Sequence, residues 1–112
     1  MEPLVVLVTC SRTDEASRIA RALVDEHLAA CVNVVPGLRS VYRWQGRVEH
    51  ADELLLIVKT SRDLLDEVVA RVQGLHSYTV PEVIALPVQG GAAPYLAWLE
   101  AQVRAPARPS GG

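Results

Sequence analysis

Hydrophobic and polar positions divide the first part of the chain into a strand and a helix. The run LVVLVTC at residues 4–10 is almost continuously apolar and β-branched, which is typical of a strand covered on both faces. Residues 11–30 then carry apolar side chains at spacings of three and four, which predicts an amphipathic helix. Thr13 is the expected N-cap, and Asp14 and Glu15 suit the positive end of the helix dipole. The expected buried face consists of Ala16, Ile19, Ala20, Leu23, Val24 and Leu28.

Residues 31–60 predict a long β-hairpin. β-Branched residues flank Gln45 and Gly46, a pair that suits a tight turn. Pro36 and Gly37 interrupt the first arm, which is typical of a bulge or bend in an edge strand. Each arm extends about 35 Å at roughly 3.3 Å per residue, well beyond an ordinary strand of about five or six residues. Much of the hairpin should therefore overhang the core of a single chain.

The rest of the pattern predicts a second helix, a last strand and a short final helix. Residues 61–74 form the helix, with Ser61 as its cap and Gly74 as its end. The strand is expected at 83–88 and the final helix at 94–103. The apolar face of the second helix consists of Leu64, Leu65, Val68, Val69 and Val72.

The order β-α-β-β-α-β followed by a helix predicts an α+β fold of the ferredoxin-like type. In this βαββαβ sandwich, two right-handed crossovers build a four-stranded antiparallel sheet with two helices on one face. A single domain is expected over residues 1–104, with a disordered tail at 105–112. The second face of the sheet must either be solvated or pack against another subunit.

Composition narrows the possible partners and the compartment. A formal net charge of -2 lacks the basic surface that DNA or RNA requires, so no nucleic-acid partner is expected. The chain has neither an apolar run of about 20 residues nor a cationic signal sequence, which predicts no membrane partner and a cytoplasmic location. Cys10 and Cys31 would be reduced in that compartment, which argues against a structural disulfide. The sequence has no CxxC pair, so it lacks the strongest signal for zinc or a redox dithiol.

Three residues are candidates for binding a metal ion. Cys10 ends the first strand just before a helix N-terminus, a position that lowers a thiol pKa and favours the thiolate. His76 and Glu82 flank the loop that enters the last strand. Thiolate, imidazole and carboxylate together suit copper or zinc, with copper favoured by intrinsic affinity. The alternatives are that Cys10 is a small core residue and that His76 is solvated in its loop.

Catalytic motifs are absent from the sequence. It contains no GxSxG elbow, no HExxH, no phosphate-binding glycine loop and no carboxylate pair suited to acid and base roles. An enzyme is therefore not expected.

Four segments resemble the CutA family of divalent-cation-tolerance proteins. They are LAACVNVVPGLRSVYRWQGRVE at 28–49, LLLIVKT at 54–60, VPEVIALPV at 80–88 and YLAWL at 95–99. The resemblance implies a ferredoxin-like fold, a homotrimer related in architecture to PII signalling proteins, and a role in tolerance to copper and other divalent metals. Either Cu(II) or Zn(II) is the implied ligand, and neither is expected to be required for folding.

Carried over by position, the resemblance implies that Cys10, His76 and Glu82 are linked to metal. Family members commonly read close to HPYEVPE, whereas this chain has Ser77 in place of the proline and Thr79 in place of the acidic residue. Some members have a second histidine where this chain has Leu75. Two potential ligands are therefore missing, and the metal binding that we expect at clefts between subunits is weak.

The overhanging hairpin independently favours an oligomer. It carries Tyr42, Arg43 and Trp44, residue types that anchor protein interfaces, and an uncovered strand edge would invite aggregation. Together with Trp98, these three residues are the expected interface residues. The alternative is that the hairpin aromatics fold back on their own sheet.

Two rival functions follow from the same residues. A PII-like sensor would bind a small anionic metabolite in clefts between subunits, through Arg39, Arg43 or Arg47, with Arg39 and Tyr78 as cleft residues. A trimeric scaffold would present a protein partner, with metal binding incidental.

Overall fold

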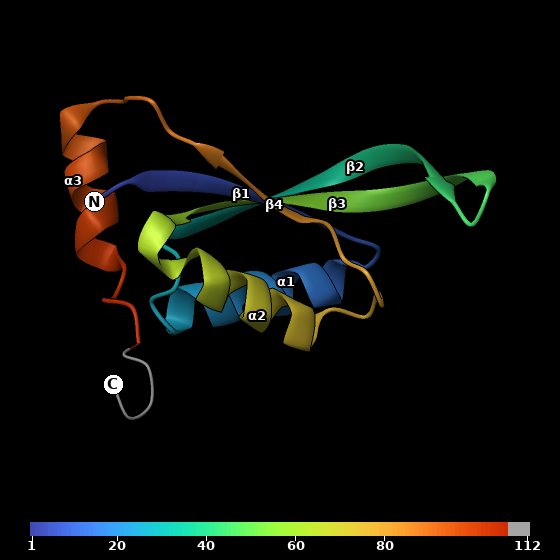
Figure 1. Ribbon diagram of the computed structural model, residues 1–112, viewed down its shortest axis with the longest axis horizontal. Helices are drawn as coiled ribbons and strands as arrows, with labels where there is room; N and C mark the ends of the chain where they lie inside the picture. Colours follow the sequence, from blue (N-terminus) through green and yellow to red (C-terminus); the bar gives the residue numbers. More distant parts are fainter. Residues whose placement is uncertain (108–112) are drawn as a thin grey trace.

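The computed structural model describes residues 1–107, which fold into one four-stranded sheet and three helices (Figure 1). The sheet order is β2-β3-β1-β4, and every neighbouring pair is antiparallel. This arrangement is the predicted ferredoxin-like βαββαβ fold with a long hairpin and a C-terminal helix. The elements are β1 (Pro3–Cys10), α1 (Thr13–Asp25), β2 (Cys31–Trp44), β3 (Arg47–Ser61), a 3-10 turn η1 (Arg62–Leu64), α2 (Leu65–Leu75), β4 (Val83–Pro87) and α3 (Ala93–Gln102).

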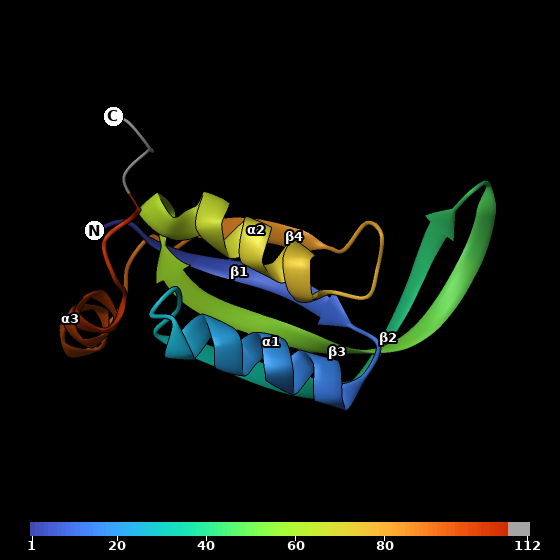
Figure 2. The same cartoon turned by 90° about the horizontal axis from the view of Figure 1, so that it is seen from below.

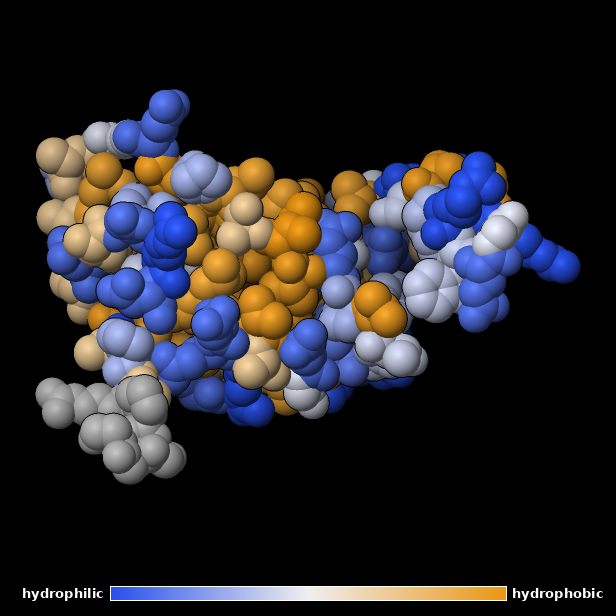
Figure 3. Space-filling model, in the orientation of Figure 1, coloured by the Kyte–Doolittle hydropathy of each residue, from blue (hydrophilic) through white to orange (hydrophobic). Residues whose placement is uncertain are grey.

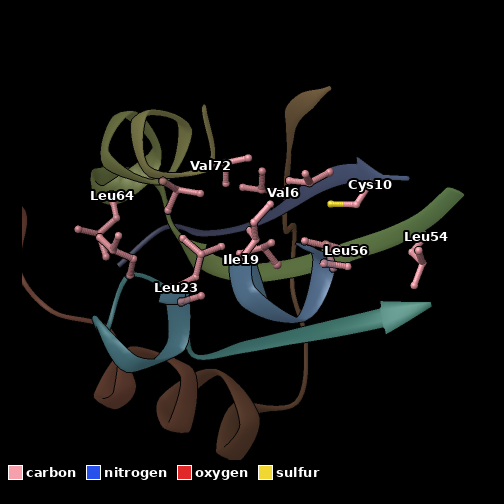
Figure 4. Close-up of a cluster of buried hydrophobic side chains, with 14 residues drawn as sticks. Val6, Cys10, Ile19, Leu23, Leu54, Leu56, Leu64 and Val72 are labelled. Atoms are coloured by element: carbon pink, nitrogen blue, oxygen red, sulfur yellow. The ribbon is translucent and has the colours of Figure 1, made fainter. Parts of the chain in front are cut away.

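Helices α1 and α2 lie side by side on one face of the sheet, and α3 packs at the end where the chain begins (Figures 1 and 2). Alternate side chains of β1 and β3 point toward α1 and α2, because successive residues of a strand face opposite sides. Figure 4 shows the resulting cluster, in which Val6 and Leu56 from the sheet meet Ile19 and Leu23 from α1. These contacts confirm the predicted core faces of both helices, except that Val24 is 39% exposed at the edge of α1.

The opposite face of the sheet is covered by neither α1 nor α2. Ile84 and Leu86 of β4 are 53% and 50% exposed, although both are large apolar side chains. Val5 and Leu7 of β1, which alternate with the buried residues of that strand, are partly exposed. Figure 3 shows hydrophobic surface gathered over the middle of the molecule, with hydrophilic surface toward the hairpin tip.

The hairpin of β2 and β3 has the predicted bulge and turn. Its register shifts between Val35 and Leu38, at the Pro-Gly pair, where Gly37 has a φ of +80°. At the tip, Gln45 and Gly46 both have positive φ, of 50° and 79°, as a type I′ turn requires.

Three predicted helix boundaries are wrong by a short distance. Thr13 is the first helical residue of α1 rather than its cap, because Arg12 holds the extended N-cap conformation. Ser61 ends β3 and makes no side-chain cap bond, since the 3-10 turn η1 separates it from α2. Gly74 lies inside α2, which continues to Leu75.

Of the predicted tail at 105–112, residues 108–112 lie outside the described residues. Within the described part, the N–H of Ala107 donates a hydrogen bond of 3.1 Å to Glu67 on α2. No helix between residues 1 and 107 has the length and apolar character needed to cross a membrane.

Candidate metal site

Three different ligand types meet where β1, α1 and α2 converge. The thiol of Cys10, a carboxylate oxygen of Glu15 and a ring nitrogen of His76 all lie within 4.8 Å of one another, and all three residues are buried. The Cys10 sulfur is 3.7 Å from Nε2 of His76. Among residues 1–107, no other three His, Cys, Asp or Glu side chains meet in this way.

Local structure explains how these side chains come together. Cys10 ends β1 on the face that points toward the helices, in register with Leu54 of β3. Glu15 lies in the first turn of α1, where side chains tilt back toward the helix N-terminus and hence toward the end of β1. His76 follows α2 in an extended conformation, and its N–H donates to the carbonyl of Val72 at 2.9 Å.

Both nitrogens of the His76 ring have protein partners. Nδ1 lies 3.0 Å from the backbone N–H of Tyr78 and accepts its hydrogen bond. Nε2 lies 2.7 Å from the carbonyl oxygen of Thr9, so Nε2 must carry the proton and donate. The imidazole is therefore neutral, with its proton on the nitrogen that faces Cys10. A metal ion at Nε2 would have to displace both this proton and the bond to Thr9.

Ser77 holds the carboxylate of Glu15 in place. Its backbone N–H donates to one carboxylate oxygen at 2.5 Å, and its hydroxyl donates to the other at 3.1 Å. A proline at this position, as in the common pattern of the resembling family, has neither an N–H nor a hydroxyl. Both hydrogen bonds to Glu15 thus come from groups that a proline would lack.

The prediction that Cys10 favours the thiolate is wrong. Burial, followed by the negative charges of Glu15 and Glu53, raises the pKa of the Cys10 thiol to about 11. Figure 4 shows Cys10 beside Val6 and Leu56 at one end of the hydrophobic cluster. The apolar surroundings and the two carboxylates outweigh the helix N-terminus. The thiol is protonated at neutral pH, and a metal ion must displace that proton.

The structure brings two of the three sequence candidates together and leaves the third apart. Glu82 is exposed and is not a member of the buried group. The sequence predicts Glu15 only as a partner of the helix dipole, so sequence reasoning misses its place in this site. The available signal was its place in the first helical turn, directly after the strand that ends in Cys10.

Tyr78 connects the buried group to the base of the hairpin. Its ring lies 4.7 Å from the ring of His76, and its hydroxyl donates to Oε2 of Glu53 at 2.7 Å. Burial and the bond to the Glu53 carboxylate raise the pKa of Tyr78 to about 12. Tyr78 is therefore a neutral donor at physiological pH.

The predicted interface residues lie on exposed surfaces. Tyr42 and Trp44 on the hairpin are 44% and 47% exposed, and Trp98 on α3 is 44% exposed. Arg39 and Arg43 are exposed along β2. These side chains are thus accessible to a partner in the single chain.

Comparison with known proteins identifies the family. Residues 4–102 match the family described as CutA1 divalent ion tolerance protein. The divalent-cation tolerance protein CutA of Thermus thermophilus is 55% identical over 95 residues, which cover 85% of this chain and 92% of that protein. Protein CutA, chloroplastic, of Arabidopsis thaliana is 48% identical over 101 residues, which cover 90% of this chain. The match covers 56% of the Arabidopsis protein, so the chain spans about half the length of that relative.

The solved structures agree with the sequence relatives. The divalent cation tolerance protein of Thermus thermophilus superposes with a TM-score of 0.89 at 51% sequence identity. The alignment covers 91% of this chain and 99% of that chain. Since both the sequence match and the fold extend over nearly the whole domain, the chain belongs to the CutA1 family of divalent ion tolerance proteins.

Proposed function

We propose that this chain is a non-enzymatic, homotrimeric protein that binds divalent metal ions weakly through Cys10, Glu15 and His76. The observation that carries the proposal is the buried approach of one sulfur, one oxygen and one nitrogen donor to within 4.8 Å of one another. The family's description as divalent ion tolerance proteins supports the same chemistry. A cytoplasmic location, which keeps both free cysteines reduced, is part of this proposal.

The donor set fits copper or zinc. Sulfur and imidazole ligands favour Zn(II) and copper over Mg(II) or Ca(II), and the intrinsic order of affinities places Cu(II) above Zn(II). Three protein ligands are one fewer than the four of a closed structural zinc site. The helices α1 and α2 and the sheet bury an apolar core between them. We therefore expect the chain to fold without a metal ion.

Weak affinity follows from the bonds that the donors already make. The Glu15 carboxylate accepts two hydrogen bonds from Ser77, and the His76 ring is engaged on both nitrogens. A metal ion must break some of these bonds and must also remove the thiol proton of Cys10. Each of these steps costs free energy and therefore weakens metal binding.

The trimer is supported by the uncovered face of the sheet and by the hairpin. Exposed apolar residues such as Ile84 and Leu86 form a surface that a second copy would bury. Exposed Tyr42, Trp44 and Trp98 are residue types that anchor interfaces. In such a trimer, the loop from His76 to Glu82 lies near a subunit boundary if the hairpin packs against a neighbour.

The rival functions find less support. A sensor of small anions needs cationic side chains around its ligand. None of Arg39, Arg43 and Arg47 lines the two cavities that lie beside the hairpin in residues 1–107. No surface feature of those residues favours a particular protein partner for a scaffold.

The test is a calorimetric titration of chelator-treated protein with Cu(II) and Zn(II). Saturation near one ion per chain is expected, with binding lost in Cys10→Ala, His76→Ala and Glu15→Gln. Cys31→Ala and His50→Ala are the matched controls, because they remove a thiol and an imidazole outside the buried group. Glu82→Gln compares the two carboxylates directly and should leave binding unchanged. Undiminished binding by Cys10→Ala, or loss only in Glu82→Gln, would contradict the proposed ligand set.

A further inference from the structure

The segment that follows α3 folds back onto the ends of both covering helices. Residues 102–107 contact the C-terminal end of α1 and the first turn of α2, and we call them the C-terminal clasp. Val103 of the clasp packs against the hydrophobic core. Figure 2 shows the chain leaving α3 and reaching the start of α2.

His27 is the first attachment point of the clasp. It follows α1 with a φ of 58°, and two backbone hydrogen bonds close the helix end there as a Schellman motif. Glycine is the usual residue at this position, because a Cβ disfavours the left-handed conformation. The imidazole Nδ1 donates to the carbonyl of Gln102 at 3.0 Å, and the carbonyl of His27 accepts from the N–H of Arg104 at 2.9 Å. The histidine thus holds the clasp by both its side chain and its backbone.

Glu67 is the second attachment point, in the first turn of α2. One carboxylate oxygen accepts from the guanidinium of Arg104 at 2.5 Å, and the other accepts from the N–H of Ala107 at 3.1 Å. The hydrogen bond from Arg104 holds the pKa of the Glu67 carboxyl below its usual range, so the carboxylate is charged at neutral pH. Two donors on one charged carboxylate fix the clasp more firmly than a single surface ion pair.

The rest of α3 is held lightly. Leu99 is its buried residue, whereas Tyr95 and Trp98 are each 44% exposed, with their rings 5.6 Å apart. An ion pair of 3.9 Å joins the amino terminus of the chain to the helix. Residues 88–92 connect β4 to α3 without regular structure and contain two glycines, which leave this connection conformationally free. The clasp therefore restrains the end of α3 that lies opposite this connection.

We propose that the C-terminal clasp positions α3 so that Tyr95 and Trp98 meet a neighbouring copy of this chain, with His27 and Glu67 as its positioning residues. This inference rests on the proposed trimer, in which Trp98 is an interface residue. When the clasp opens, α3 can tilt about Leu99 and carry the aromatic pair away from the neighbour. Closure of the clasp and association of the chains therefore stabilise each other.

Trypsin cleavage after Arg104 measures opening of the clasp in the intact protein, because a protease cuts the open form. Glu67→Ala should speed formation of the fragment that ends at Arg104 at least about fivefold, since both of its hydrogen bonds are lost. Asp66→Ala is the matched control, because it removes an exposed carboxylate from the same helical turn. It should change the rate less than about twofold.

His27→Gly separates the clasp from the local structure of α1. Glycine suits the left-handed position, so a purely local role of His27 predicts unchanged or slower cleavage after Arg104. Loss of the imidazole bond to Gln102 instead predicts faster cleavage, which is the result expected.

A double-mutant cycle tests whether the clasp acts through the aromatic pair. Association is measured by sedimentation equilibrium at a urea concentration where the wild type is half assembled. Glu67→Ala should weaken association at least about threefold in the wild type, and less than about half as much in a Trp98→Ala background. Asp66→Ala should leave association unchanged in both backgrounds.

Three results would overturn the proposal. Equal cleavage of Glu67→Ala and Asp66→Ala would show that Glu67 does not hold the clasp. Equal weakening of association by Glu67→Ala with and without Trp98 would show that the clasp does not act by positioning this residue. A wild-type mass of a single chain would remove the trimer and with it the positioning role, although the cleavage rates would still report on the clasp.

Discussion

At the residue scale, the proton on Cys10 controls what the buried group can bind. Its sulfur is fully buried among apolar side chains and close to two carboxylates, and each of these surroundings favours the neutral thiol. The His76 ring keeps its proton on Nε2, the nitrogen that faces the sulfur, and donates it to the carbonyl of Thr9. Metal binding at this site is therefore coupled to proton release.

We expect the affinity for Zn(II) to rise with pH. The thiol pKa is raised to about 11, so the thiol remains protonated throughout the ordinary experimental range. Between about pH 7.5 and 9, each pH unit should strengthen binding about tenfold, because one thiol proton leaves for each ion bound. Competition titrations against a chelator of known pH dependence measure this slope.

The control for the pH dependence is Cys10→Ala at the same pH values. This variant should show no saturable binding at any of these pH values. A wild-type affinity that does not change with pH would mean that the thiol is not a ligand.

At the scale of elements, the bulge in β2 decides on which side of the hairpin its side chains lie. Val35 pairs with Leu55 and Leu38 pairs with Glu53, so β2 advances three residues while β3 advances two. Because strand side chains alternate, this extra residue in β2 moves each later side chain of the strand to the opposite side of the sheet. Tyr42 and Trp44 consequently lie on the same side as Glu53.

Two glycine substitutions should have opposite effects on stability. Gly37→Ala should destabilise the protein by about 1–2 kcal/mol, because Gly37 has a φ of +80° that alanine disfavours. Gly74→Ala should stabilise it by up to about 1 kcal/mol, because Gly74 lies in α2 without a positive φ. An added Cβ meets nothing within 4 Å at either position. Backbone conformation alone therefore decides whether each substitution stabilises or destabilises the protein.

Urea unfolding of both variants and the wild type at one protein concentration measures these changes. Equal loss of stability in the two variants would contradict the left-handed conformation of Gly37 as the cause.

At the scale of the whole molecule, the sheet has one covered face and one open face. The helices α1 and α2 bury the first face in a continuous core. The second face presents partly or fully exposed valine, leucine and isoleucine side chains. The hairpin projects beyond the body of the molecule (Figure 1). Association with another copy would bury this apolar surface.

Sedimentation equilibrium should give three times the chain mass of 12.2 kDa. Trp44→Ala should weaken association by about 2 kcal/mol or more if the indole is a buried anchor. Val24→Ala, at an exposed position on α1, is the control and should leave association unchanged. A wild-type mass of a single chain would contradict the proposed trimer.

Much of the fold is predictable from the sequence because its signals are local. The spacing of apolar residues in 11–30 and 61–74 predicts both helices that cover the sheet, and the run at 4–10 predicts its buried strand. Gln45 and Gly46 predict the hairpin turn from their conformational preferences alone. Helix ends are less predictable, as Thr13 and Gly74 demonstrate, because neighbouring elements decide where a helix starts or stops.

The sequence by itself determined the order of the elements, the core faces and the hairpin, since periodicity and turn preference act over a few residues. Only the tertiary structure decided the site. Glu15 meets Ser77 across 62 positions, and Cys10 meets His76 across 66. The thiol remains protonated because burial and the carboxylates of Glu15 and Glu53 act on it together. Contact and burial depend on the folded arrangement of the whole chain, which no local pattern contains.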